Sequence, residues 1–236
     1  MSVLVYAESW NKRFRKSTFE TISYAYETAK ILGTDLVAIS FGHVSDDELI
    51  KTGNYGASKI ISYPNINKSD NESAAKIISD LSIDASVIIF SNTYTAKMIA
   101  PRLSVKINAA SITNVISLIS NSNVKVKRQS FSTKAIELVE SKTEKTILSI
   151  ALNSFRLSEM GGACTIDKRD SSDHGSIKIL DQEIATGKVS LSEAEIIVSG
   201  GRGLKGPENW TMIEELAQLL GAATACSKPV SDIGWR

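Results

Sequence analysis

Residues 195–232 constrain the fold of this chain more than any other segment. The β-branched run Ile196, Ile197 and Val198 predicts a short buried strand. Four glycines follow at positions 200, 201, 203 and 206, and apolar residues then recur at helical spacing at positions 210, 213, 216 and 220. Residues 222–226 predict a second strand. The segment is therefore expected to fold as a strand, a glycine-rich turn, a helix and a strand.

Three of these glycines, Gly201, Gly203 and Gly206, spell G-x-G-x-x-G between the predicted strand and helix. Such glycines allow a tight turn and let backbone N–H groups approach a pyrophosphate. An ordinary NAD site has Asp or Glu at the end of the second strand, to bind the ribose hydroxyls. Here Ser227 and Lys228 stand at that point, which argues against an NAD-dependent dehydrogenase.

Two cations accompany the glycine turn. Arg202 is flanked by glycines and offers little to packing, so we interpret it as a ligand-binding residue. Arg202 and Lys228 together favour an anionic ligand, or a cofactor that becomes anionic when it is reduced. Glu208 argues against a simple phosphate cradle, because its carboxylate would compete for the positive start of the helix.

The stretches VSGGRGLKGPENW and LLGAATACSKPVSDIGW resemble the start of the FAD-binding domain in alpha subunits of the electron transfer flavoprotein family. The resemblance covers the whole chain, and it implies that Arg202 and Ser227 bind FAD, with Gly201 and Gly203 in the same motif. The family's next basic residue lies against the isoalloxazine ring and is usually arginine. Lys228 keeps that charge but lacks the planar guanidinium group.

The family's FAD-binding domain continues beyond these motifs, with a glutamine-threonine-glycine loop, a serine-glycine-alanine turn and an asparagine-aspartate-proline stretch. The 236-residue sequence contains none of them. Two strands and one helix bury too little surface to fold alone. We therefore expect a chain cut short, with residues 189–236 as the beginning of an FAD-binding domain and with an incomplete FAD site.

Residues 1–188 predict a Rossmann-like amino-terminal domain. Alternating strands and helices indicate a parallel sheet with right-handed crossovers. The expected strands are 3–7, 36–40, 59–62 and 87–90, and the expected helices are 17–32, 46–55, 71–81 and 93–105. Residues 124–131, 135–139 and 146–152 predict strands without helices between them, hence an antiparallel extension. Residues 153–188 are polar and are interpreted as irregular surface segments that end in a linker.

Three local features of this domain carry expectations. Ser17 and Glu20 have the spacing of a capping box at a helix start. The polar and basic stretch of residues 9–16 has no glycines, so we favour a solvated loop over a phosphate-binding loop. Asn92 and Thr93 follow a strand, at the end where open α/β sheets bind ligands, and we expect one of them to cap the next helix.

Composition excludes several classes of protein. A net charge of +1 gives no electrostatic case for nucleic acid or an anionic membrane, and no apolar run approaches the ~20 residues of a membrane span. Cys164 and Cys226 have neither metal-ligand nor disulfide-framework spacing, which indicates a reducing compartment. His43 and His174 are too few for a histidine metal site. With no signal or transit peptide recognised, we expect the bacterial cytoplasm.

The resemblance implies one half of a heterodimeric electron carrier. Its amino-terminal domain would hold the beta subunit, and FAD would pass electrons from acyl-CoA or similar dehydrogenases of fatty acid β-oxidation to a quinone reductase. Two alternatives stay open. The chain could belong to an electron-bifurcating flavoprotein with a second FAD in its partner, or it could be a non-redox nucleotide-binding or scaffold module of Rossmann type.

Overall fold

The computed structural model describes residues 2–120, 123–172, 175, 177, 180, 181, 191 and 194–235. The chain divides into two compact units, Met1–Leu180 and Asp181–Arg236, here called the amino-terminal and carboxyl-terminal units. The expected domain boundary between residues 188 and 189 lies outside the described residues. In the described part, no helix is both long enough and apolar enough to cross a bilayer.

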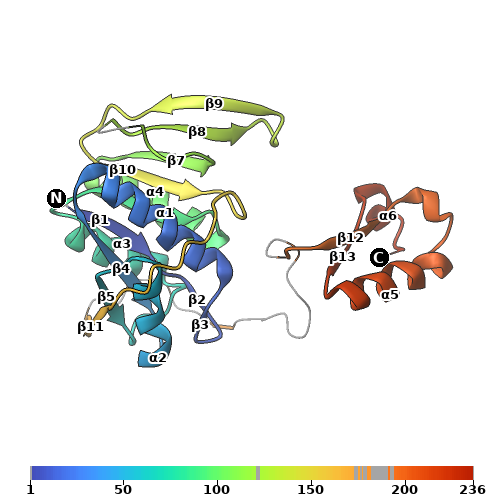
Figure 1. Cartoon of the computed structure of the whole chain (residues 1–236), viewed down its shortest axis with the longest axis horizontal. Helices are drawn as coiled ribbons and strands as arrows, with labels where there is room; N and C mark the ends of the chain where they lie inside the picture. Colours follow the sequence, from blue (N-terminus) through green and yellow to red (C-terminus); the bar gives the residue numbers. More distant parts are fainter. Residues whose placement is uncertain are drawn as a thin grey trace. The chain divides into compact units, whose positions relative to one another are not determined.

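The amino-terminal unit is built on a mixed sheet whose strand order is β11-β5-β4-β1-β6-β10-β7-β8-β9 (Figure 1). Its strands are β1 (Ser2–Tyr6), β4 (Asp35–Phe41), β5 (Lys59–Tyr63), β6 (Ala85–Ser91), β7 (Ala110–Val115), β8 (Lys125–Ser130), β9 (Ala135–Glu140), β10 (Thr146–Ile150) and β11 (Thr165–Lys168). The strands from β11 to β7 pair in parallel, and β8 and β9 extend the sheet in antiparallel fashion. The expected parallel sheet with an antiparallel extension is confirmed.

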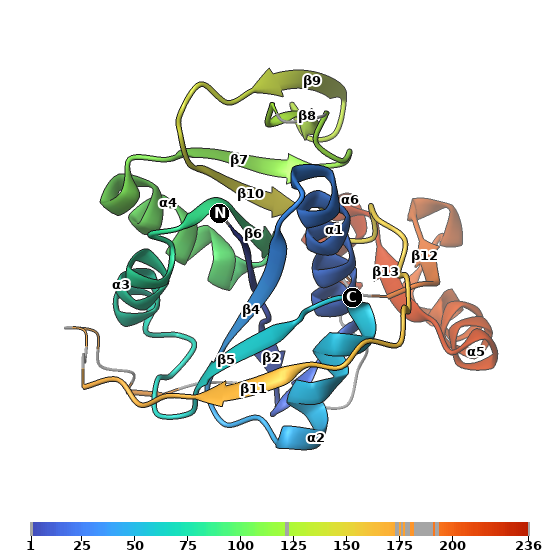
Figure 2. The ribbon, with the colours of Figure 1, turned by 60° about the vertical axis from the view of Figure 1, so that its left-hand side comes forward.

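Helices cover both faces of the parallel part of this sheet, as Figure 2 shows. Helix α1 (Lys16–Leu32) packs on one face through Ile22, Ala25 and other buried residues. Helices α3 (Asn71–Leu81) and α4 (Tyr94–Ile107) pack on the other face. At the β5 side of the sheet the short helix α2 (Asp46–Leu49) continues as a 3-10 turn, η1 (Ile50–Tyr55). Burial on both faces explains why the central strands read as unbroken apolar runs.

Two predictions about the sheet are wrong. Strand β10 was expected in the antiparallel extension, but it lies between β6 and β7 and pairs in parallel with both. All five of its residues are buried, as a central strand requires. The polar segment after residue 153 was expected to be irregular, yet it contributes β11, a parallel edge strand beside β5.

The expected capping box is also wrong. Helix α1 begins at Lys16, its N-cap Arg15 makes no side-chain cap hydrogen bond, and Ser17 is buried in the first turn. Glu20 is 3% exposed, and its carboxylate accepts the backbone N–H groups of Asn153 at 3.0 Å and Phe155 at 2.6 Å. It therefore anchors the segment after β10 rather than its own helix start.

The basic stretch near the amino terminus is more ordered than a solvated loop. Strands β2 (Ser9–Trp10) and β3 (Arg13–Phe14) form an antiparallel hairpin. Its two turn residues, Asn11 and Lys12, have φ of 48° and 65°, the left-handed conformation that a two-residue hairpin turn needs. The charged side chains of Lys12 and Arg13 remain exposed, as expected.

The carboxyl-terminal unit follows the predicted order of strand, turn, helix and strand. Its elements are β12 (Ile197–Gly200), the 3-10 turns η2 (Arg202–Leu204) and η3 (Pro207–Trp210), α5 (Thr211–Leu220), β13 (Ala223–Cys226) and α6 (Lys228–Asp232). Trp210, Ile213 and Val230 form its core. Leu216 and Leu220 were expected on the buried stripe but are 46% and 48% exposed, because Ala217 takes the inner position.

Candidate functional site

The two strands of the carboxyl-terminal unit end side by side. β12 and β13 pair in parallel, with Gly200 opposite Cys226, and the Ser227 N–H donates to the Gly200 carbonyl oxygen at 3.1 Å. A Cβ placed on Gly201 would lie 3.9 Å from Ser227 Oγ. The structure thus brings the predicted residues Gly201 and Ser227 together at the carboxyl edge of this sheet.

Arg202 and Lys228 each come one residue after this contact. Arg202 opens the turn η2, which is closed by main-chain hydrogen bonds from the Leu204 N–H to the Gly201 oxygen at 3.1 Å and from the Lys205 N–H to the Arg202 oxygen at 3.0 Å. The turn is therefore fixed without the Arg202 side chain, which is exposed.

Ser227 is the N-cap of α6, but its hydroxyl makes no cap hydrogen bond. The helix start is held instead by the Val230 N–H, which donates to the Ser227 carbonyl oxygen at 2.8 Å. Ser227 is exposed, and its hydroxyl group lies on the side of Gly201 where another residue would carry its Cβ atom. A small polar group at this position can bind a ligand without breaking a structural contact.

The charges around this edge are uneven. Arg202 and Lys228 are both exposed, and within the described residues neither forms an ion pair. The carboxylate of Glu208 lies against Gly206, where an added Cβ would be 2.1 and 2.3 Å from its two oxygens. Glu208 thus occupies the start of η3, as its sequence position suggested, and this start is not available as a phosphate cradle.

Packing requires one glycine that lies outside the G-x-G-x-x-G spacing. A Cβ on Gly200 would come within 2.7 Å of both Leu204 and the Trp210 ring. By contrast, a Cβ on Gly203 would meet nothing within 4 Å. None of the three motif glycines has a positive φ. The turn therefore depends on Gly200 for close packing, whereas a Cβ on Gly201 would make only an ordinary contact, 3.9 Å from Ser227 Oγ.

An open hollow of about 370 Å³ lies beside the same turn, lined by Gly203, Leu204, Glu208, Asn209, Thr211 and Met212. It contains neither Ser227 nor Lys228, and its only charged lining group is a carboxylate. These features do not fit an anionic ligand, so we place the candidate site at the strand edge and not in this hollow.

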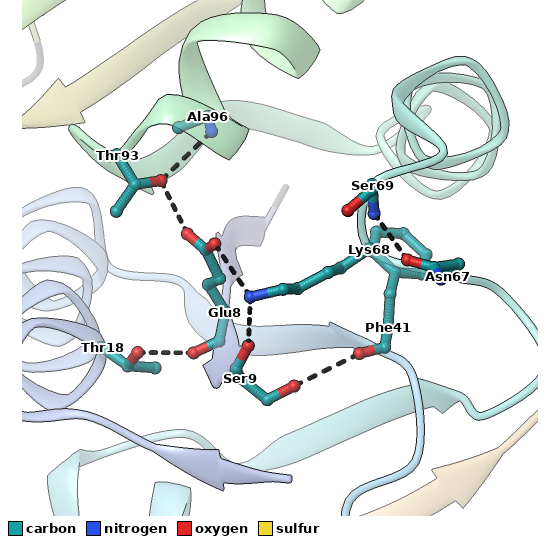
Figure 3. Close-up of polar contacts among 9 residues, drawn as sticks. All are labelled: Glu8, Ser9, Thr18, Phe41, Asn67, Lys68, Ser69, Thr93 and Ala96. Carbon is teal, nitrogen blue, oxygen red and sulfur yellow. Dashed lines mark hydrogen bonds and ion pairs between the residues drawn. The ribbon is translucent and has the colours of Figure 1, made fainter. Parts of the chain in front are cut away.

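The carboxyl edge of the amino-terminal unit is the second place where a ligand was considered. Thr93 caps α4, as predicted, because its Oγ1 accepts the Ala96 N–H at 3.2 Å. The same hydroxyl donates to Glu8 Oε2 at 2.6 Å (Figure 3). Sequence reasoning missed Glu8, although an acidic residue directly after a buried strand was a usable signal.

The remaining candidates are the two cysteines and the two histidines. Cys164 is buried beside Thr52, and burial raises the pKa of its thiol. Cys226 is partly buried and packs against the small core of the carboxyl-terminal unit. His43 is exposed, and His174 lies outside the described residues. Among the residues with described positions, no group of His, Cys, Asp or Glu could hold a metal ion.

Two family models match this chain. The electron transfer flavoprotein domain matches residues 3–174, and the electron transfer flavoprotein FAD-binding domain matches residues 190–236. The chain belongs to the electron transfer flavoprotein family. Its members are electron carriers, and FAD is the cofactor of the second domain, which this chain covers in part.

Several relatives of this electron transfer flavoprotein chain are alpha subunits that match it over nearly its whole length. The alpha subunit of Syntrophomonas wolfei is 27% identical and covers 98% of the chain and 74% of its own length. The alpha subunit of Bacillus subtilis is 28% identical, and the match covers 98% of this chain and 73% of the relative. Subunit LctC of lactate dehydrogenase (NAD(+),ferredoxin) from Acetobacterium woodii is 25% identical, and the match covers 99% of this chain and 59% of the relative.

The residues at the strand edge fit FAD. An uncommitted hydroxyl on Ser227, a neighbouring glycine without a side chain and two exposed cations match a cofactor with pyrophosphate and carbonyl oxygens.

The packing of Gly200 gives a test of this geometry. Gly200→Ala should destabilise the carboxyl-terminal unit by about 1–3 kcal/mol, because the new methyl group overlaps Leu204 and Trp210. Limited proteolysis of the full chain should then cut this unit about tenfold faster or more. Gly203→Ala is the matched control and should be cut at the wild-type rate. Equal rates for the two variants would contradict the packing described.

Proposed function

We propose that this chain is the alpha subunit of a heterodimeric, FAD-containing electron carrier of the bacterial cytoplasm. It would receive electrons from acyl-CoA or related dehydrogenases and deliver them to a quinone reductase. The observation that supports this most is the parallel pairing of β12 and β13, which places the Arg202 turn and Ser227 at one sheet edge. When bound, FAD supplies the redox chemistry, and the chain supplies binding and electrostatics.

Each residue of the proposed site has a separate role. Arg202 would bind an anionic part of FAD from a turn that is already closed by main-chain hydrogen bonds. Ser227 would donate a hydrogen bond from its hydroxyl, and Gly201 would keep the space beside it open. Lys228 would favour the reduced cofactor, because a nearby cation lowers the energy of negative charge on the flavin.

The amino-terminal unit would serve as the docking domain. Alpha subunits of this family pair with a beta subunit, and we propose that this chain does so through residues 1–188, the amino-terminal domain expected from the sequence. Transient contact with dehydrogenases and the quinone reductase would then occur in the assembled heterodimer.

The test is co-expression with the gene of the beta subunit, followed by an absorbance spectrum of the purified assembly. We expect a flavin spectrum with one FAD per heterodimer, and bleaching of the flavin band when acyl-CoA and an acyl-CoA dehydrogenase are added. A heterodimer that takes up no flavin under any reconstitution would contradict the proposal and favour a non-redox scaffold.

A second function has one specific observation in its favour. The Acetobacterium woodii relative is named as a subunit of a lactate dehydrogenase that uses NAD(+) and ferredoxin. A bifurcating function for this chain would require a second FAD in its partner. Two flavins per purified heterodimer would support bifurcation, and a single flavin would support the simple carrier.

The role of Lys228 gives a quantitative prediction. In the assembled heterodimer, Lys228→Gln should lower the reduction potential of the flavin by roughly 30–100 mV, because one nearby positive charge is lost. Lys205→Gln, at the far end of the η2 turn, is the matched control and should change the potential little. Spectroelectrochemical titration measures both. An unchanged potential in Lys228→Gln, or an equal shift in the control, would refute this role.

A further inference from the structure

The strand order of the amino-terminal unit reverses between β1 and β6. The chain first adds β4 and β5 on one side of β1 and then places β6 on the other side. In open α/β sheets, ligands bind at the carboxyl ends of the strands at such a reversal. Here the two loops that leave this point carry Glu8, after β1, and Thr93, after β6.

The side chains of these two residues are hydrogen-bonded to each other at the point where the strand order reverses. Glu8 is 2% exposed, and its Oε2 accepts the Thr93 hydroxyl hydrogen at 2.6 Å, as Figure 3 shows. Its other oxygen, Oε1, lies 3.7 Å from Lys68 Nζ. The carboxylate is therefore buried between an N-cap hydroxyl and a cation from the loop before α3.

Three further contacts hold this arrangement. Thr18 of α1 donates its hydroxyl hydrogen to the Glu8 carbonyl oxygen at 2.7 Å. Lys68 Nζ donates to the Ser9 carbonyl oxygen at 2.9 Å and lies 3.4 Å from the centre of the Trp10 ring. The β1, β5 and β6 loops thus converge on one carboxylate (Figure 3).

The groups around Glu8 are those that bind phosphate in other proteins. A lysine, a hydroxyl at a helix N-cap and the positive start of a 14-residue helix all favour a dianion. The same edge carries buried hydroxyl groups on Ser40 and Ser91 that have no hydrogen-bond partner among the described residues. Buried polar groups of this kind are expected to line a polar site rather than an apolar core.

We propose that Glu8 is an internal ligand that fills a phosphate-type site at the β1–β6 edge. Its carboxylate uses the donors that would otherwise hold a phosphate group, so the amino-terminal unit excludes phosphate-bearing ligands from this edge. Removing the carboxylate frees the Thr93 hydroxyl hydrogen and takes the negative charge away from Lys68, which keeps its hydrogen bond to Ser9. Both changes should give this edge affinity for a phosphate group. This inference concerns a different unit from the flavin site and does not depend on the proposed function.

Glu8→Ala in the full chain tests the proposal. Calorimetric titration with inorganic phosphate and with a nucleoside monophosphate should show binding more than about tenfold tighter than to the wild type. In the variant the Thr93 hydroxyl and Lys68 can interact with the ligand, whereas in the wild type they interact with the Glu8 carboxylate. Glu8→Ala/Lys68→Met should lose this gain. Glu27→Ala, a partly exposed glutamate of α1, is the control and should bind as the wild type does. A gain with phosphate alone identifies a free-anion site, and a larger gain with the monophosphate identifies a nucleotide site.

Glu8→Ser covers the case in which Glu8→Ala does not fold. The serine side chain is polar and uncharged, and it leaves most of the volume of the carboxylate empty for a ligand. The melting temperature of Glu8→Ser should rise with phosphate more than that of the wild type, relative to chloride of equal ionic strength. The proposal is overturned if a folded Glu8 variant gains no phosphate binding over the wild type, or if the wild type itself binds phosphate as tightly as the variant.

Discussion

The parallel pairing of β12 with β13 is the interaction on which the proposed flavin site depends. Parallel strands end at the same edge of a sheet, so the residues that follow them are brought together by the backbone alone. Gly200 and Cys226 are the last paired residues, and the proximity of Gly201 to Ser227 follows from this pairing. The side chains of Arg202 and Lys228 are left uncommitted, which a ligand-binding edge requires.

The two units use the same edge geometry with opposite results. In the carboxyl-terminal unit the strand ends present exposed cations and an uncapped hydroxyl. In the amino-terminal unit the strand ends meet around Glu8, whose buried charge must be compensated because desolvating a lone carboxylate is costly. Thr93 and Lys68 supply this compensation. One edge is therefore available to an anionic cofactor, while the other is occupied by the chain's own anion.

Much of this architecture could be predicted from the sequence because its elements carry strong local signals. Apolar runs marked the central strands, and Gly33 and Gly221 end their helices in the left-handed conformation expected of C-caps. The place of β10 could not be predicted, because an apolar run shows burial but not which strands it pairs with. Ser17 and Glu20 have capping-box spacing, but tertiary hydrogen bonds to residues 153 and 155 determine where Glu20 points.

Sequence motifs identified the residues of the candidate site, but they did not predict how these residues are arranged in space. The glycine-rich turn and the absence of an acidic residue after the second strand pointed to Arg202 and Lys228, and the resemblance to a family assigned FAD binding to Arg202 and Ser227. Their place at one sheet edge follows from strand pairing, which the sequence spacing does not give. The steric role of Gly200 depends on Trp210, ten residues away, and became visible only in the packed unit. Glu8 was missed because its partners come from loops about 60 and 85 residues further along the chain.

The most direct measurement is the flavin content of a variant in which a disulfide joins positions 201 and 227 across the proposed site. In a Cys226→Ser background, Gly201→Cys with Ser227→Cys places two thiols within bonding reach, because a Cβ on Gly201 already lies 3.9 Å from Ser227 Oγ. The flavin content of the heterodimer is then read from its absorbance before and after a reductant is added. This account predicts that the oxidised variant excludes FAD. The reduced variant should bind FAD more weakly than the Cys226→Ser background, because it lacks the Ser227 hydroxyl and has a side chain at position 201, but measurably more than the oxidised variant. Full flavin content in the oxidised variant, with the disulfide verified by mass, would contradict it.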